Sequence, residues 1–180
     1  MVAFHKTTGA QRMTTWGLVC TTNAPMQAVL NFAAWHLELG AHRLYIYLDA
    51  PDEACFAALK AHPRIRPQVT DSAYWDDNSS ARPKKHQPRQ TFNATRTYER
   101  RADVDWLSHV DVDEFLIPEL PVHQLLDALP AGTDTARIRP MEALAPDGAP
   151  SEHFDFKTLV LDRPTRRKLA TEVWPTFGPY

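Results

Sequence analysis

The sequence contains no continuous apolar run long enough to cross a membrane, so it predicts no transmembrane segment. Its first residues, Met1 to Lys6, lack the apolar stretch of a secretory signal peptide. Only two cysteines occur, Cys20 and Cys55, and their spacing matches no metal site. We therefore expect both to be reduced core residues of a cytoplasmic protein.

An excess of charge of one sign is also missing. The formal net charge is -2 at pH 7, which argues against nucleic acid as the main partner. The length of 180 residues and the hydrophobic share of 43% suffice for one globular domain with its own core. Composition alone therefore predicts an ordinary globular protein.

Strand-like and helix-like segments alternate through the first two thirds of the sequence. The predicted strands are residues 16–22, 43–48, 65–69 and 106–110. Asn23 and Asp52 can cap the helices that follow the first two strands, and Gly40 can end the first helix. Pro67 indicates an edge position for the third strand. The pattern predicts an α/β fold with a mostly parallel sheet and helices on both faces.

Polar residues follow each of the four predicted strands. They are Thr21 to Asn23, Asp49 to Asp52, Thr70 with Asp71, and Asp111 to Glu114. Parallel α/β sheets bind their ligands at the carboxyl ends of the strands. The sequence therefore predicts a binding site where these four segments meet.

The most informative of these segments runs from Asp111 to Glu114, between two apolar flanks. Three carboxylates this close repel one another unless a cation lies among them. In a strand or a tight turn, Asp111 and Asp113 are two residues apart and point the same way, while Val112 points back to the core. Such a pair could hold one Mg²⁺ or Mn²⁺ that also binds phosphate oxygens. The alternative is a solvated acidic turn without a ligand.

A long polar connection, residues 71–88, precedes the strand that leads to these acidic residues. Long connections in compact domains are often functional. Arg82 and Lys85 lie in this connection, Arg89 directly follows it, and the three could meet a diphosphate. The arginines further along the following helix-like segment fit a solvated basic face better.

After Ile117 the pattern becomes irregular and rich in proline. A short helix is predicted over residues 122–129, a strand over residues 135–139, and a strand pair over residues 154–156 and 159–161. We divide the chain into a flexible lead-in, residues 1–15, a ligand-binding half, residues 16–117, and a last part, residues 118–180. The apolar residues near Tyr180 predict that this last part is incomplete.

Two motifs resemble those of inverting glycosyltransferases of the family 2 type, which have the GT-A fold. Trp106-Leu107 followed by Asp111-Val112-Asp113-Glu114-Phe115 is similar to the hallmark of a bacterial branch of this family. His36 and Gly40, placed before the second strand, also match its spacing. The first loop departs from the pattern, because Thr22-Asn23-Ala24 stands where the family often has a charged pair. The resemblance covers residues 16–117 and implies that they are a nucleotide-sugar-binding half, with residues 118–180 the start of an acceptor-side half.

This resemblance implies roles for particular residues. Thr21 or Thr22, with Asn23, would contact the donor nucleotide, and Asp49 would face its base or ribose. Asp111 would lie toward the ribose and the metal, and Asp113 would bind the Mn²⁺ or Mg²⁺. The cationic contact to the phosphates would come from Lys85 or Arg89. We expect the general base beyond Tyr180, and we interpret His36 as a packing residue rather than a catalyst.

The expected function is the transfer of a sugar from a nucleotide-diphosphate donor, such as a UDP-sugar, to a glycan or a lipid-linked acceptor. Contact with a membrane surface is compatible with such an acceptor. Two alternatives stay open. One is a metal-dependent phosphohydrolase, and the other is a remnant that binds nucleotide-sugars without transferring them.

Overall fold

The computed structural model describes residues 2–5, 13–78, 81–100, 102–144 and 155–157. The chain divides into two compact units, Met1–Ile138 and Arg139–Tyr180. The elements below belong to the first unit unless stated otherwise.

The first unit is built on a sheet whose described strands have the order β4-β3-β2-β5-β1-β6. The strands are β1 (Val2–His5), β2 (Trp16–Thr22), β3 (Arg43–Leu48), β4 (Ile65–Val69), β5 (Trp106–His109) and β6 (Thr135–Arg137). The four strands from β4 to β5 are parallel, whereas β1 pairs antiparallel with both β5 and β6. The predicted α/β fold with a mostly parallel sheet is therefore confirmed, in a general Rossmann-like form.

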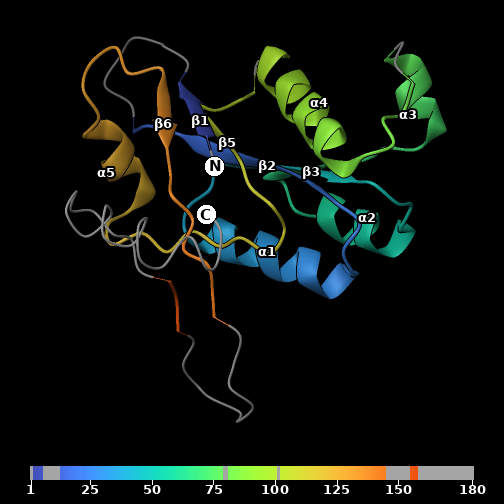
Figure 1. The fold of residues 1–180 in the computed structure, drawn as a ribbon, viewed down its shortest axis with the longest axis horizontal. Coiled ribbons are helices and arrows are strands. Elements are labelled where there is room, and N and C mark those ends of the chain that lie inside the picture. Colours follow the sequence, from blue (N-terminus) through green and yellow to red (C-terminus); the bar gives the residue numbers. More distant parts are fainter. Residues whose placement is uncertain (1, 6–12, 79–80, 101, 145–154, 158–180) are drawn as a thin grey trace, which may run out of the picture. The chain divides into compact units, whose positions relative to one another are not determined.

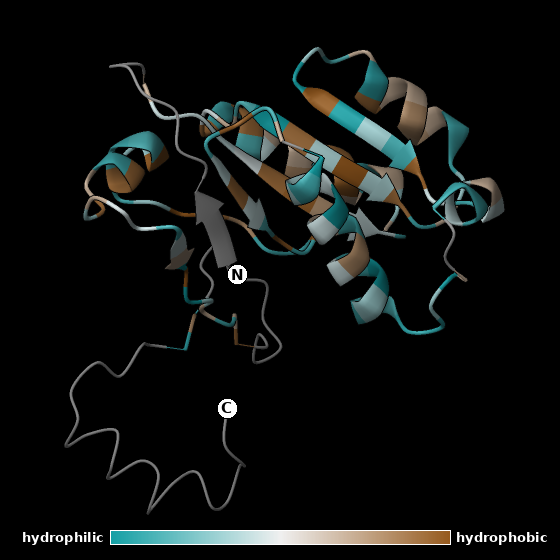
Figure 2. Cartoon of the chain, turned by 90° about the horizontal axis from the view of Figure 1, so that it is seen from above, coloured by the Kyte–Doolittle hydropathy of each residue, from teal (hydrophilic) through white to brown (hydrophobic). Residues whose placement is uncertain are grey.

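Helices cover both faces of this sheet (Figure 1). They are α1 (Met26–Glu38), α2 (Glu53–Lys60), α3 (Ser72–Asp77), α4 (His86–Glu99) and α5 (Val122–Asp127). One core cluster joins apolar residues of α1 and α2 to the sheet, and a second joins residues of α3 to the opposite face. Figure 2 shows the hydrophobic residues concentrated along the central strands.

The central strand β2 is buried along its whole length, because it has a strand on each side and a helical layer on each face. Leu18 and Cys20 point to one core cluster, and Val19 points to the other. Gly17 lets β3 come close, since a Cβ at this position would lie 2.6 Å from the carbonyl oxygen of Arg43. The uninterrupted apolar run that predicted this strand thus reflects burial on both faces.

The helix boundaries agree with the predicted signals at two places and differ at a third. The carboxylate of Asp52 accepts a hydrogen bond of 2.9 Å from the backbone N–H of Cys55 and so caps α2. Gly40 follows α1 with a φ of 91°, a conformation that favours glycine. The prediction that Asn23 caps α1 was wrong: the helix begins at Met26 after Pro25, and no side chain among the described residues caps it.

Two segments carry structure that the sequence analysis did not expect. Val2–His5, assigned to a flexible lead-in, forms β1 and pairs with β5. Ser72–Asp77, assigned to the polar connection, forms α3 and buries Trp75, which is 2% exposed. Trp75 packs on Phe92 of α4 with ring centroids 5.1 Å apart, so α3 belongs to the second core cluster.

In the second unit the structure describes residues 139–144 and 155–157. Ala143 and Phe156 form an isolated antiparallel bridge, and Lys157 forms an ion pair with Glu142. The strand pair predicted for residues 154–156 and 159–161 lies mostly outside the described residues.

Within the described ranges, no helix combines the length and the apolar character needed to cross a membrane.

Candidate functional site

A pocket of about 640 Å³ opens at the carboxyl ends of β2 and β5. From β2 the chain moves outward through β3 and β4, and it then returns to place β5 on the other side of β2. Ligands of open α/β sheets bind at such a reversal of strand order. The described lining consists of Thr21, Thr22, Asn23, Ala24, Ala28, Asn31, His86, Gln87, Gln90, Asp111, Val112, Asp113 and Phe115.

The first wall of the pocket is the end of β2. Thr21 is 2% exposed, and its hydroxyl accepts a hydrogen bond of 3.0 Å from the side-chain amide of Asn93. The hydroxyl of Thr22 accepts one of 3.0 Å from the backbone N–H of Ala24 and shapes the loop. Asn23 is exposed at the pocket. The structure therefore brings these three predicted residues together, with Asn23 the most accessible.

A second wall is the acidic turn, residues Asp111–Glu114, directly after β5, the neighbour of β2 in the sheet. The N–H of Glu114 donates to the carbonyl of Asp111 at 3.0 Å, and the Glu114 carboxylate accepts from the N–H of Asp111 at 3.1 Å. The side chain of Glu114 is thus engaged within the turn, while Asp111 and Asp113 line the pocket. Gln90 of α4 donates a hydrogen bond to the Asp111 carboxylate. Both members of the predicted pair thus line one cavity, and they do so from a hydrogen-bonded turn rather than an extended segment.

Cys20 lies under this concentration of negative charge. Burial raises the pKa of its thiol, and the charges of Asp111, Asp113 and Glu114 raise it further. The thiol stays protonated and unreactive at neutral pH. The interpretation of Cys20 as a reduced core residue is consistent with this environment.

Asp49 lies in a different place from the one expected for a ligand contact. Its side chain is 2% exposed and accepts hydrogen bonds from Arg89 Nε at 2.7 Å, Arg82 Nη2 at 3.1 Å and Thr70 Oγ1 at 3.2 Å. His86 Nδ1 is 3.7 Å from the same carboxylate. Asp49 is therefore the buried anchor of a cationic cluster, and the described lining of the pocket does not include it.

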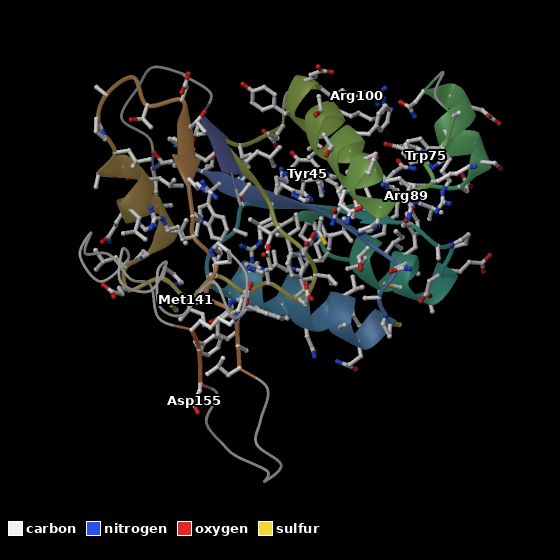
Figure 3. The ribbon with its side chains drawn as sticks, viewed as in Figure 1. Tyr45, Trp75, Arg89, Arg100, Met141 and Asp155 are labelled. Atoms are coloured by element: carbon white, nitrogen blue, oxygen red, sulfur yellow. The ribbon has the colours of Figure 1, made fainter. Side chains whose placement is uncertain are left out.

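The guanidinium of Arg89, near the start of α4, is likewise bonded to other groups of the protein (Figure 3). Besides Asp49, it donates through Nη1 to the carbonyls of Pro83 and Lys84 at 2.8 and 2.9 Å. Lys85 is exposed and lies, like Arg89, outside the described lining. The structure thus does not bring Lys85 or Arg89 to the pocket with the other predicted residues.

Three pocket residues that the sequence analysis did not single out come from the first turns of α4: His86, Gln87 and Gln90. The long-range position of α4 over the end of β2 places them there. No local pattern marks them, because α4 reads as a polar helix. Phe115 was part of the quoted motif, although its place in the pocket wall was not predicted.

His36 of α1 is fully buried and bonded at both ring nitrogens. Nδ1 lies 2.9 Å from the carbonyl of Phe32, and the backbone N–H of Leu116 donates to Nε2 at 3.3 Å. Because a carbonyl only accepts, Nδ1 carries the proton and the ring is neutral. Burial also lowers the pKa of His36. The interpretation of His36 as a hydrogen-bonded packing residue is confirmed.

The described carboxylates that line the pocket are those of Asp111 and Asp113. No group of three or more His, Cys, Asp or Glu side chains able to hold an ion occurs in the described part of the chain. Asp111 and Asp113 supply oxygen atoms from one side only, which fits Mg²⁺ or Mn²⁺ completed by water and phosphate oxygens better than a closed protein cage.

The chain matches no protein-family model, no curated protein and no solved structure.

Proposed function

We propose that this chain binds the nucleotide-diphosphate part of a sugar donor in the pocket between β2 and the acidic turn, and that it serves sugar transfer. The observation that carries the proposal is the common cavity of Asp111, Asp113 and the Thr21–Asn23 loop. These two walls come from the strands on either side of the reversal in strand order. The size of the cavity, about 640 Å³, falls within the range of roughly 300–1,000 Å³ for small-molecule sites.

In this proposal Asp111 and Asp113 hold a Mg²⁺ or Mn²⁺, and Gln90 keeps one oxygen of Asp111 engaged, which fixes the orientation of that carboxylate. When bound, the ion would act as a Lewis acid that neutralises charge on the diphosphate leaving group. The chain's own part is to hold the two carboxylates on one side of the cavity. Val112, between them, packs toward the core and keeps the turn in place.

The phosphates have a second source of positive potential in the N-terminal end of α4. His86 and Gln87 line the pocket in the first turn of this 14-residue helix. No described side chain caps that turn, which leaves the backbone N–H groups of His86 and Gln87 as its donors, because Pro88 has none. Helix N-termini attract anions through these groups and through the helix dipole. This replaces the contact that the sequence analysis assigned to Lys85 or Arg89.

The acceptor hydroxyl requires a general base, and His36 is unsuitable because both of its nitrogens are engaged. Among the described residues that line the pocket, His86, Asp111 and Asp113 are the titratable ones. A protein that binds the donor without transferring sugar is therefore the second candidate.

Calorimetry with UDP, with and without Mn²⁺, tests the proposal. Asp113→Asn should abolish the effect of Mn²⁺ on UDP affinity, while Asp76→Asn, which removes an exposed carboxylate from α3, should leave it intact. Failure of the wild-type chain to bind UDP, or equal Mn²⁺ dependence in Asp113→Asn, would refute the proposal. Release of UDP from UDP-sugars then separates a transferase from a protein that only binds, and cleavage of simple phosphate esters would indicate a phosphohydrolase.

A further inference from the structure

The segment after the acidic turn is fixed by two neighbouring side chains of α1. Trp35 Nε1 donates to the carbonyl of Leu116 at 2.8 Å. His36 Nε2 accepts from the N–H of Leu116 at 3.3 Å. Both polar groups of one loop residue are thus bonded to adjacent residues of a helix about 80 positions earlier in the sequence. We refer to Trp35 and His36 as the α1 clamp.

Ring contacts extend the α1 clamp to the pocket wall. Phe115 stacks on His36 with centroids 5.9 Å apart and an interplanar angle of 11°. It meets Trp35 edge to face at 6.0 Å and 86°. Phe115 also lines the pocket beside Asp113. The clamp therefore contacts the residue that directly follows the acidic turn.

The acidic turn is consequently held at both of its ends. On the N-terminal side, the N–H of Val110 donates to the carbonyl of Val19 at 3.1 Å, which continues the pairing of β5 with β2. On the C-terminal side, the α1 clamp holds Leu116. Between these points the turn carries three negative charges that repel one another. A turn that repels itself needs such fixed ends to keep Asp111 and Asp113 on the same side.

Trp35 shows that the clamp is more than core packing. Trp35 is 43% exposed, so burial alone explains its position poorly. Its indole N–H nevertheless bonds to Leu116. His36, by contrast, is fully buried among Phe32 and other core residues. The two residues thus act on the same peptide from the surface and from the core.

We infer that Trp35 and His36 are positioning residues, which hold the Leu116 backbone so that the acidic turn presents Asp111 and Asp113 to the phosphates of a nucleoside diphosphate. This inference rests on the proposed function for its ligand. Its geometric part, the fixing of residues 111–116, can be measured without any ligand. Neither Trp35 nor His36 belongs to the described pocket lining.

Three variants test the inference. Trp35→Phe removes only the indole donor and keeps a ring against Phe115. His36→Gln keeps an acceptor at the place of Nε2, whereas His36→Asn keeps only a group at the place of Nδ1 and leaves the N–H of Leu116 without its partner. Hydrogen exchange of residues 111–116, thermal unfolding, and UDP affinity in the presence of Mn²⁺ are measured for each.

We expect Trp35→Phe and His36→Asn to speed exchange at residues 111–116 and to weaken UDP binding with Mn²⁺ by about tenfold. His36→Gln should restore both properties to within about threefold of the wild type. Trp35→Phe should speed exchange and weaken UDP binding with little change in melting temperature, since Trp35 is partly exposed. It therefore serves as the decisive variant if His36→Asn fails to fold.

Unchanged UDP affinity in a folded Trp35→Phe variant would overturn the inference, even if its exchange rises. A wild-type chain that does not bind UDP with Mn²⁺ would instead refute the proposed function. In that case exchange at residues 111–116 alone decides whether the clamp fixes the turn, and unchanged exchange in both Trp35→Phe and His36→Asn would reject it.

Discussion

Replacing Arg89 by methionine should destabilise the fold severely, because Arg89 is the main partner of a buried charge. Asp49 has a side chain that is 2% exposed, and Arg89 reaches its Oδ2 through two nitrogens at 2.7 Å each. Its other described partners are Thr70, Arg82 at 3.1 Å with a side chain 46% exposed, and His86 at 3.7 Å. Removing one member of a buried ion pair costs about 3–5 kcal/mol. Arg82 offsets part of this loss, so we expect a value of about 3 kcal/mol.

Urea unfolding of wild type and Arg89→Met measures this loss. The matched control is the pair Arg43–Asp103, whose side chains are 18% and 72% exposed. Asp103→Asn should cost less than about 1 kcal/mol, because exposed ion pairs contribute little. The double variant Asp49→Asn with Arg89→Met should recover part of the stability, since the uncompensated charge is then gone. Arg89→Met as stable as wild type, with UDP affinity lost, would show that Arg89 acts on ligand instead.

Three further predictions follow from single contacts. Gln90→Ala should weaken UDP binding with Mn²⁺ by about threefold to tenfold in calorimetry, since the Asp111 carboxylate loses its donor; equal affinity would refute the orienting role. Gly17→Ala should lower the free energy of unfolding by about 1–3 kcal/mol, because the new Cβ would lie 2.6 Å from the carbonyl oxygen of Arg43. A denaturant titration that shows no loss of stability would contradict this close approach. Burial lowers the pKa of His36 in the folded chain below its usual value. The unfolded chain therefore binds more protons at this residue as the pH falls, so the free energy of unfolding should decrease below about pH 6.5. His36→Gln should lose part of this dependence in melting curves recorded from pH 7.5 to 5, whereas a profile identical to that of the wild type would reject the assignment.

The elements around the site could be predicted from local pattern, because burial on two faces leaves a direct trace in the sequence. The run Trp16–Thr22 has apolar or small residues throughout, and it is the buried central strand. The side chain of Asp52 can cap a helix, and Gly40 lacks a side chain and so allows the positive φ that follows α1. Pro67, which cannot donate a backbone hydrogen bond, lies in β4, the strand that ends the described sheet on that side.

The sequence predicted the contacts of charged residues less well. The residue type is the same whether a charged side chain binds a ligand or pairs with another side chain of the protein. Asp49 and Arg89 both carry the residue type and strand-end position expected of donor contacts. They instead pair with each other across 40 positions of sequence. An uncompensated carboxylate at 2% exposure would be costly, so the fold uses the nearest cations to neutralise it.

The sequence by itself determined the positions of the four parallel strands along the chain and the place of the acidic residues at the end of one of them. These properties depend on neighbours within a few residues, through periodicity and backbone geometry. Only the tertiary structure decided that α4 brings His86 and Gln90 to the pocket, and that His36 bonds Leu116. Such contacts join segments that are far apart in the chain, and their selection depends on how all the packed layers fit together.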